Sequence, residues 1–355
     1  MADLERAARA ELGTAVADFI AGGAGDEVTL RANEAAWRDY QLWPRVMVDV
    51  RDADPSVVVD GHRLDAPLLV SPMGVHQLAS PEGELASATA ARRAGIGYVA
   101  SSASSVSLED IAEVAPAFRW FQLYWLRDRE VVADLVQRAK DAGYTGLCLT
   151  VDAPVGAARL RDRRNGFAVP EGIRFANLER YGFAPASRGS TGDAVRYIVD
   201  EVDPSITWQD LAWLKELCGL PLVVKGALHP DDAELAREHG ADAEFISNHG
   251  GRQLDQAPAT AHALARVSAT EPRLPLVVDG GVRSASSVAV AVSLGATLVG
   301  IGRPVLWALA ADGVDGATRL LTGLRDDLGR VLALMGVRST DELRASRQVS
   351  GPHLA

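Results

Sequence analysis

Eight short apolar runs alternate with segments of helical periodicity between residues 66 and 311, and this alternation restricts the fold more than any other feature of the chain. The predicted strands are 67–71, 96–101, 120–124, 146–152, 221–225, 243–248, 275–279 and 297–302. Helical patterns lie between them at 83–94, 130–142, 208–218, 231–239, 260–267 and 285–294. Such an order predicts an α/β fold, the (β/α)₈ or TIM barrel. A doubly wound open sheet is the alternative.

Polar, charged and small residues follow nearly every predicted strand. They are Ser71, Pro72, Met73, Gly74, Ser101, Ala103, Gln122, Tyr124, Thr150, Asp152, Lys225, Ser247, His249, Asp279, Gly280, Gly281, Arg283, Gly302 and Arg303. The carboxyl ends of the strands of a barrel meet at one mouth, where barrel enzymes place their active sites. We therefore expect these residues to surround one site.

The segments outside this alternation are assigned separately. We expect a single domain over 1–355, with an N-terminal helical cap at 1–60, a barrel at 66–311 and a C-terminal helical segment at 312–355. The cap contains one amphipathic helical pattern at 3–20 and another at 26–37. The connection 167–206, after the fourth strand, has no strong periodicity, so we predict a lid loop or a partly disordered segment there.

The nonapeptide 247–255 combines a histidine, an arginine and two glycines at the end of a buried strand. His249 can take a proton near neutral pH. Arg252 can bind a carboxylate through two parallel hydrogen bonds. The pattern favours oxidation of the carbon next to a carboxylate, and the alternative is a polar loop with a chance histidine.

Other charged residues extend this site. Asp152 is expected to orient His249 and raise its pKa. Lys225 ends a buried strand and needs an anionic partner, either a structural salt bridge or a reduced flavin ring. Tyr124 is assigned to a substrate oxygen and Arg159 to a second guanidinium near the site, with barrel packing and a surface position as the respective alternatives.

The last two strand ends predict a phosphate site. The runs 279–283 and 300–303 offer free backbone N–H groups and the guanidiniums of Arg283 and Arg303, at the usual phosphate position of barrels. The alternative is that the glycines only form tight turns. No G-x-G-x-x-G follows a first strand, so a mononucleotide is implied. A flavin-free aldolase with Lys225 as a Schiff base is a rival function.

Composition limits the partners. A net charge of −11 argues against nucleic acid. Cys148 and Cys218 are the only cysteines, and no metal-ligand spacing is present. No apolar run is long enough to span a bilayer, and the charged N-terminus lacks a signal-peptide core. We expect a cytoplasmic protein without a metal, a membrane anchor or a nucleic-acid partner.

The run Ser-Asn-His-Gly-Gly-Arg-Gln at 247–253, together with 279–283 and 302–303, resembles the FMN-dependent 2-hydroxy acid oxidase and dehydrogenase family, and the match covers almost the whole chain. The resemblance implies FMN, with His249 as base, Asp152 as its partner, Arg252 and Arg159 on the carboxylate and Lys225 at the flavin ring. It also implies residues that line the flavin. These are Pro72, Met73, Gly74, Ser101, Gln122 and Thr150, with Arg283 and Arg303 on the phosphate.

Departures from the family pattern suggest the substrate. Phe19 and Ala103 stand where glycolate-type members have tyrosine and tryptophan, which favours a larger, apolar substituent. The runs 19–23 and 159–167 are most similar to hydroxymandelate oxidases. Gly74 stands where many family members have alanine. The smaller side chain could change oxygen access or the release of the keto acid, so a 2-monooxygenase reaction is a further alternative. The resemblance implies an aryl (S)-2-hydroxy acid as substrate and O2 as acceptor; a lactate-type oxidase or a dehydrogenase with another acceptor are alternatives, and family members are commonly homotetramers.

Overall fold

Eight parallel strands form a closed barrel in the computed structural model, which describes residues 1–183 and 200–354. The strands are β4 (Leu68–Val70), β5 (Gly97–Ser101), β6 (Arg119–Tyr124), β7 (Gly146–Thr150), β8 (Leu222–Lys225), β9 (Ala243–Ile246), β10 (Leu276–Val278) and β11 (Ala296–Ile301). Each coincides with a predicted strand. The first and last strands pair directly, with Leu68 beside Val299 and Val70 beside Ile301. The barrel is confirmed, and the open doubly wound sheet is excluded.

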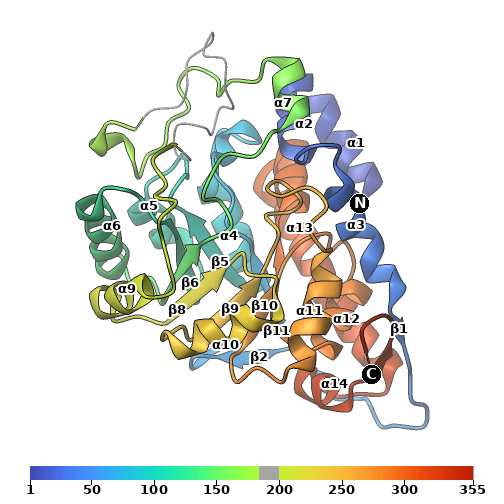
Figure 1. The fold of residues 1–355 in the computed structure, drawn as a ribbon. Helices are drawn as coiled ribbons and strands as arrows, with labels where there is room; N and C mark the ends of the chain where they lie inside the picture. The colour runs from blue at the N-terminus through green and yellow to red at the C-terminus, as the bar shows by residue number, and fades with distance from the viewer. Residues whose placement is uncertain (184–199, 355) are drawn as a thin grey trace.

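The barrel interior is filled by a cluster of apolar side chains to which every strand contributes. Its members from the strands are Leu69, Val99, Trp120, Cys148, Val223, Ala243, Phe245, Val277 and Leu298. Val57 and Leu64 join this cluster from the antiparallel hairpin of β2 (Val57–Val59) and β3 (His62–Leu64). The hairpin therefore closes the amino end of the barrel and leaves the carboxyl end for a site. Figure 1 shows β2 at the end of the molecule opposite to α2 and α7.

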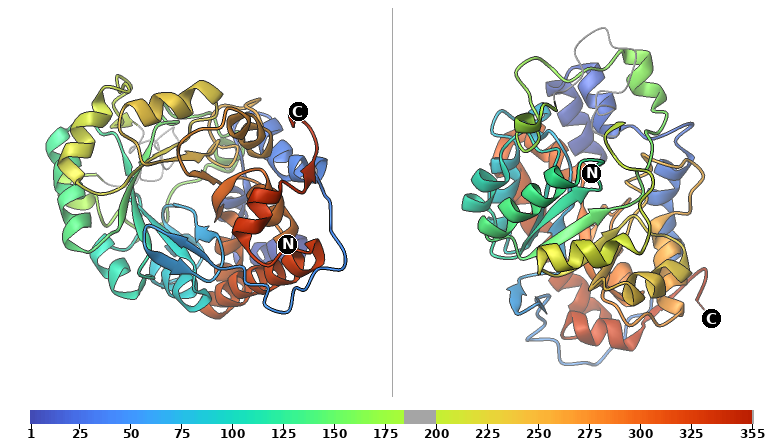
Figure 2. Two further views of the ribbon diagram at one scale, coloured as in Figure 1. Left: turned by 90° about the horizontal axis from the view of Figure 1, so that it is seen from below. Right: turned by 60° about the vertical axis from the view of Figure 1, so that its left-hand side comes forward.

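Helices surround the strands, as the view from below in Figure 2 shows. They are α4 (Glu84–Ala94), α5 (Leu108–Val114), α6 (Arg129–Asp141), α9 (Asp210–Cys218), α10 (Pro230–Glu238), α11 (Thr260–Ala269), α12 (Ala285–Ser293) and α13 (Arg303–Met335). The short helix α5 was not predicted. In α13 the backbone leaves helical conformation at Asp312 and Gly313, next to the predicted boundary at 311. The chain ends with α14 (Thr340–Ser346) and β12 (Val349–Ser350), which pairs with β1 (Gln41–Leu42).

The N-terminal cap differs from the prediction in one respect. The single helix expected over 3–20 is wrong: the chain forms α1 (Ala2–Glu11) and α2 (Thr14–Ala21), separated at Leu12 and Gly13, both of which adopt extended backbone angles. Glycine gains little from a helical conformation, so the break falls there. The second predicted helix is confirmed as α3 (Val28–Ala36), followed by the 3-10 turn η1 (Trp37–Asp39).

The long connection after β7 is only partly irregular. It begins with α7 (Leu160–Asn165), which was not predicted, and contains the 3-10 turn η3 (Glu179–Tyr181). Its end is fixed to the barrel, because Leu126 and Val202 form an isolated antiparallel bridge. Residues 184–199 of the predicted lid loop lie outside the described residues. Within the described ranges, no helix is both long enough and apolar enough to cross a membrane.

Glu244 is a buried acid within the barrel wall. Its neighbour Phe245 points into the barrel, so Glu244 faces the surrounding helices, where Asp232 of α10 lies nearby. The side chain is fully buried, and neither carboxylate oxygen has a hydrogen-bond partner among the described residues. Burial, together with the charge of Asp232, raises the pKa of Glu244 to about 8. The folded protein therefore keeps a proton here that an unfolded chain loses near pH 4.5.

Replacing Glu244 by glutamine should make the protein less sensitive to alkaline pH. Well below pH 4.5 the raised pKa does not affect the free energy of unfolding, because both states are protonated. Between pH 4.5 and pH 8 it lowers the free energy of unfolding progressively. At pH 8.5 we expect Glu244→Gln to raise the free energy of unfolding by about 3–5 kcal/mol, but by no more than about 1 kcal/mol at pH 5. Thermal unfolding at both pH values measures this, with Glu238→Gln on the exposed side of α10 as control. Equal stabilisation by Glu244→Gln at both pH values would contradict the assignment.

Candidate active site

His249 lies just beyond β9 and faces the end of β7. Its Nδ1 atom is 3.1 Å from Oδ1 of Asp152. Its backbone has φ of +58°, a left-handed conformation that histidine tolerates better than most residues. Asp152 lies close to the end of β8, and this approach requires Gly226, since a Cβ at that position would lie 2.6 Å from Cβ of Asp152. The carboxylate thus fixes one nitrogen of the imidazole and leaves the other for a ligand.

Asp152 remains ionised in this environment. Burial opposes its ionisation, but the charge and hydrogen bond of His249, with the charge of Lys225, outweigh that effect and lower the pKa of Asp152 below its usual value. Its Oδ2 atom is buried without a hydrogen-bond partner in the described structure. A negative charge beside the imidazole stabilises the protonated form that a base acquires during reaction.

Ser247 connects three groups from neighbouring strands. Its Oγ accepts hydrogen bonds from Nζ of Lys225 (2.8 Å) and from the backbone N–H of His249 (3.1 Å), and it donates to Oδ1 of Asp279 (2.6 Å). Burial disfavours the lysine charge, but Asp279 and Asp152 outweigh it and raise the pKa of Lys225. The lysine is therefore a fixed cation at the floor of the cavity.

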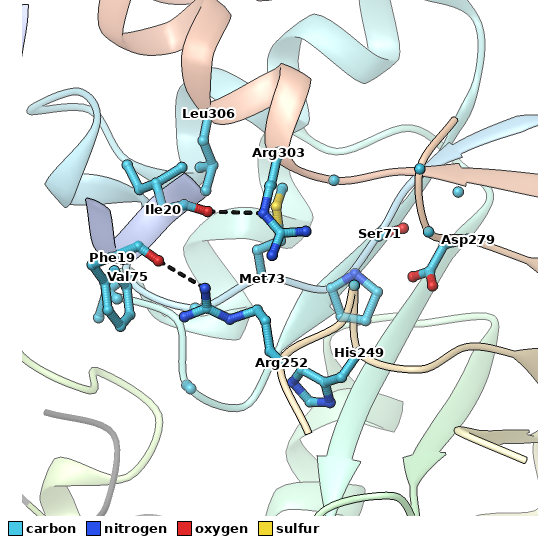
Figure 3. Close-up of a pocket in the computed structure, with 18 of the residues that line it drawn as sticks. Phe19, Ile20, Ser71, Met73, Val75, His249, Arg252, Asp279, Arg303 and Leu306 are labelled. Atoms are coloured by element: carbon cyan, nitrogen blue, oxygen red, sulfur yellow. Dashed lines mark hydrogen bonds between the residues drawn. The ribbon is translucent and has the colours of Figure 1, made fainter. Parts of the chain in front are cut away.

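Two arginines are held by the end of α2. Nη1 of Arg252 donates to the carbonyl oxygens of Phe19 (2.7 Å) and Gly22 (2.9 Å). Arg303 donates to those of Ile20 (3.0 Å) and Gly22 (2.7 Å). These carbonyls end a helix and lack partners within it, and the negative end of the helix dipole favours cations. Figure 3 shows Arg252 between Phe19 and His249, and Arg303 beside Ile20.

The arginines repel one another. Burial and the charges of Arg159 and Arg303 lower the pKa of Arg252 well below its usual value, and burial with the charge of Arg283 lowers that of Arg303 to about 10. Nε of Arg159 is buried without a hydrogen-bond partner among the described residues. The cavity is therefore prepared for anionic ligands, whose charges would relieve this repulsion.

Tyr124 ends β6 within the same group of charges. Burial and the charge of Asp152 raise its pKa, while Lys225, Arg159 and Arg252 oppose the shift. The phenol is therefore neutral at ordinary pH and can donate or accept a hydrogen bond. In the strand register, Tyr124 of β6 lies beside Thr150 of β7, and Thr150 lies beside Lys225 of β8.

One cavity at the carboxyl end of the barrel collects most of the predicted residues. Those that line it are Phe19, Pro72, Met73, Gly74, Ala103, Arg159, Lys225, His249, Arg252, Asp279, Gly280, Gly281, Arg283, Gly302 and Arg303. The remaining predicted residues are not among those that line it. They are Ser101, Gln122, Tyr124, Thr150, Asp152 and Ser247. Ser101 donates to Oε1 of Gln122 (2.9 Å), and Asp152 and Ser247 hold His249 and Lys225 as described above.

Arg283 has a partner that the sequence did not reveal. Its guanidinium pairs with Glu34 of α3 (2.7 Å) and lies over the ring of Trp307 (5.2 Å). Burial lowers its pKa, and Glu34 opposes that effect. Ser71, which ends the first predicted strand, also lines the cavity, as do Gly250, Val282 and Gly300 from the predicted runs 247–255, 279–283 and 300–303. The lining residues that the sequence did not assign to the site are Ile20, Val75, Phe175 and Leu306. Phe175 comes from a segment without periodicity.

The loop that carries His249 is anchored to the N-terminal cap. The side-chain amides of Asn33 and Asn248 exchange two hydrogen bonds of 2.8 Å in the buried interior. Oδ1 of Asn248 also accepts from the backbone of Gly251 (3.0 Å), and Asp255 accepts from the backbone of Thr29 (2.9 Å). The cap thus fixes the loop at both ends. Among the described residues, no group of three or more His, Cys, Asp or Glu side chains could hold a metal ion.

The fold and the cavity define a barrel enzyme with a partly buried histidine–aspartate pair and several cations for anionic ligands. Residues 8–349 match the model of the FMN-dependent dehydrogenase family, and the chain belongs to this family. It is 43% identical to L-lactate oxidase of Nostoc sp. over 97% of this chain and 96% of that protein. It is 42% identical to 4-hydroxymandelate oxidase of Amycolatopsis orientalis over 97% and 96%. A crystal structure of mandelate oxidase with (S)-4-hydroxymandelic acid matches with a TM-score of 0.93 and 42% identity, covering 98% of this chain and 97% of that chain.

The cavity fits FMN, the cofactor of this family. Oγ of Ser71 and Nε2 of Gln122 are buried without a hydrogen-bond partner among the described residues, so they can bind a polar heterocycle. A Cβ at Gly300 would lie 2.3 Å from Oγ of Ser71, so glycine is needed there. Arg283 and Arg303 line the same cavity, and their guanidiniums would be available to bind the phosphate of FMN.

Replacing Arg303 by methionine should weaken FMN binding through the phosphate alone. Charge-assisted hydrogen bonds contribute roughly 1.5–3 kcal/mol, so we expect the Kd for FMN to rise about 10- to 100-fold. The Kd for riboflavin, which lacks the phosphate, should stay nearly constant. Flavin fluorescence during titration of the apoprotein measures both, with the exposed Arg164→Met as the charge-matched control. An equal loss for both flavins would mean that Arg303 acts only through its bonds to Ile20 and Gly22.

Proposed function

We propose that this protein oxidises an aryl (S)-2-hydroxy acid, of the mandelate or 4-hydroxymandelate type, to the 2-keto acid, and that O2 is reduced to H2O2. The observation that carries the proposal is that the cavity has two kinds of lining. Arg159, Arg252 and His249 contribute charged and polar groups, whereas Phe19 and Ala103 contribute apolar surface. A carboxylate suits the arginines, and an aryl group suits the apolar lining.

The residues have separate roles in this proposal. Arg252 and Arg159 bind the carboxylate, and Tyr124 hydrogen-bonds an oxygen of the substrate. His249 accepts a proton from C2 or from the hydroxyl group, through the nitrogen that Asp152 does not occupy. Asp152 holds the imidazole and stabilises its protonated form. FMN, when bound, accepts the two electrons of the oxidation. Lys225 supplies positive charge to the flavin ring from its fixed position on Ser247.

Two alternatives have specific support. The identity of 43% to L-lactate oxidase supports a smaller, alkyl substrate. A glycine at 74 agrees with a 2-monooxygenase, in which the keto acid is retained and oxidatively decarboxylated by the peroxide. Packing also requires glycine at this position, since a Cβ would lie 2.9 Å from the carbonyl oxygen of Ala103 and 3.0 Å from its Cβ. A dehydrogenase with another electron acceptor is the third alternative.

We also propose that residues 1–355 act as one domain in a cytoplasmic homotetramer. The cap is joined to the barrel by the paired amides of Asn33 and Asn248, which supports a single unit. The cytoplasmic assignment is supported by Cys148 and Cys218, which are both buried and free. The tetramer rests on family resemblance.

The substrate class can be tested by anaerobic flavin reduction. We expect (S)-mandelate to bleach the flavin absorbance near about 450 nm faster than (S)-lactate does, because only its ring packs against the apolar lining. Admission of air should then restore the colour, and analysis of the products separates keto acid and peroxide from a decarboxylated acid. Faster bleaching by lactate would show that Phe19 and Ala103 do not select an aryl group.

Replacing His249 by alanine should abolish most of the reduction while FMN remains bound. A general base contributes about 10²- to 10⁴-fold, so the rate of flavin reduction by mandelate should fall by at least about 100-fold. The flavin content of the purified variant is the internal control, and the exposed His353→Ala should behave as wild type. Undiminished reduction would remove His249 as the base, and a wild-type protein that no 2-hydroxy acid reduces would indicate a flavin-binding barrel without turnover.

A further inference from the structure

Phe175 is a fully buried aromatic side chain that lines the cavity, although it comes from the loop after β7 and not from a strand end. The other aromatic lining residue, Phe19, comes from α2. Two segments far apart in the sequence therefore place phenyl rings around one cavity. The roles proposed above for His249, Arg252 and Lys225 leave Phe175 without a function.

The turn that carries Phe175 is bound to the loop after β5. The backbone N–H of Ala176 donates to the carbonyl of Ser104 (3.0 Å). Asn177, which is fully buried, donates through Nδ2 to the carbonyl of Ser101 (3.3 Å) and accepts at Oδ1 from the backbone of Leu108 (2.7 Å). These bonds satisfy a buried amide, whose loss of partners would be costly. Phe175 is thus fixed next to the loop that contains Ala103.

The same turn is held from the outside. Nη1 of Arg138, on α6, donates to the carbonyl of Asn177 (3.0 Å), while its Nε pairs with Glu109 of α5 (2.7 Å). The hydrogen bond to Glu109 outweighs partial burial and raises the pKa of Arg138, which stays charged. The position of Phe175 therefore depends on contacts with two helices and one strand end.

Val75, Ala103 and Phe19 are further apolar residues that line the same cavity as Phe175. The carbonyl of Ala103 accepts from the backbone of Val75 (3.1 Å), which brings the loops after β4 and β5 together. The ring of Phe19 stacks on Phe167 at 4.2 Å, and the guanidinium of Arg252 lies 4.9 Å from the same ring. Phe19 thus packs against a ring and a cation, and it also lines the cavity.

We propose that Phe175 is a specificity-determining residue, whose ring packs against the aromatic substituent of the substrate. The proposal rests on the proposed function and deepens it: the favoured substrates are 2-hydroxy acids with a planar ring on C2. Aromatic pairs attract one another in offset or edge-to-face geometry, beyond the area that they bury. The methyl group of a small substrate cannot form such a contact. Ala103 only leaves space for a large substituent. Phe175 would in addition attract an aromatic substituent, and so favour it over an alkyl group.

The opposite role makes an opposite prediction. A phenylalanine that fills the space left by the small Ala103 would obstruct an aryl group, and a smaller side chain at 175 would then improve aryl binding. The sign of the effect separates a binding wall from an obstruction.

The test uses two unreactive acids that correspond to mandelate and lactate without their hydroxyl groups. Phenylacetate and propionate are titrated into the FMN-loaded enzyme, and the change in flavin absorbance gives each Kd. For Phe175→Leu we expect the Kd of phenylacetate to rise about 3- to 10-fold and that of propionate to change by less than about twofold. kcat/KM for mandelate relative to lactate should fall by a similar factor.

Two further variants make the result specific. Phe183→Leu removes a buried ring from the same loop, but Phe183 does not line the cavity, so its Kd ratio should equal that of wild type. Phe175→Met nearly conserves side-chain volume and serves where the leucine variant does not accumulate; it should shift the ratio in the same direction.

The outcomes separate this inference from the proposed function. If wild type binds propionate more tightly than phenylacetate, the aryl assignment itself fails. If wild type prefers phenylacetate and Phe175→Leu leaves the ratio unchanged or increases it, only the role of Phe175 is overturned. A selective loss of phenylacetate binding supports both.

Discussion

The hydrogen bonds between β11 and β4 are the constraint on which the rest of the structure depends. Pairing Val299 with Leu68 and Ile301 with Val70 closes the sheet, and closure places all eight carboxyl ends around one mouth. Without this pairing, β4 and β11 would be the two opposite edges of an open sheet, and Ser71 after β4 would lie far from Asp279 and Gly300. Closure makes them neighbours across the same cavity, with Gly300 providing room for Ser71. The chemistry of the site is therefore a consequence of topology before it is one of local sequence.

The N-terminal cap holds two arginines and the histidine loop in place at the mouth of the closed barrel. The last carbonyls of α2 have no partners within the helix, and they bind Arg252 and Arg303, which would otherwise repel each other in a buried space. The paired amides of Asn33 and Asn248 attach the same cap to the loop of His249. The cap therefore contributes to the active site through backbone carbonyls and amides, although few of its side chains line the cavity.

The alternation of apolar strands and helices was sufficient to predict the barrel, because strand ends and helix periods are local signals. It was also sufficient to place His249, Lys225 and Asp279 at one mouth. The break near Gly13 was missed because an amphipathic pattern continues through 3–20 although one residue in it favours extended backbone. The pairs of Arg283 with Glu34 and of Asn33 with Asn248 join residues more than 200 positions apart, and no local pattern marks them. Phe175 was missed for the same reason: its place depends on how Asn177 binds the loop after β5.

The charged residues at the strand ends and the apolar lining residues of the cavity come from different parts of the fold. Lys225, Ser247 and Asp279 belong to or directly follow three adjacent strands, so their distances are set by strand register, and a shift of one residue would reverse the side-chain directions. The apolar lining is built from loop residues and from α2, whose side chains can change in size without altering that register. The loop residues Val75, Ala103 and Phe175, which line the cavity, carry no charge. An enzyme built in this way can keep the arrangement of its strand-end residues while the apolar part of its cavity changes.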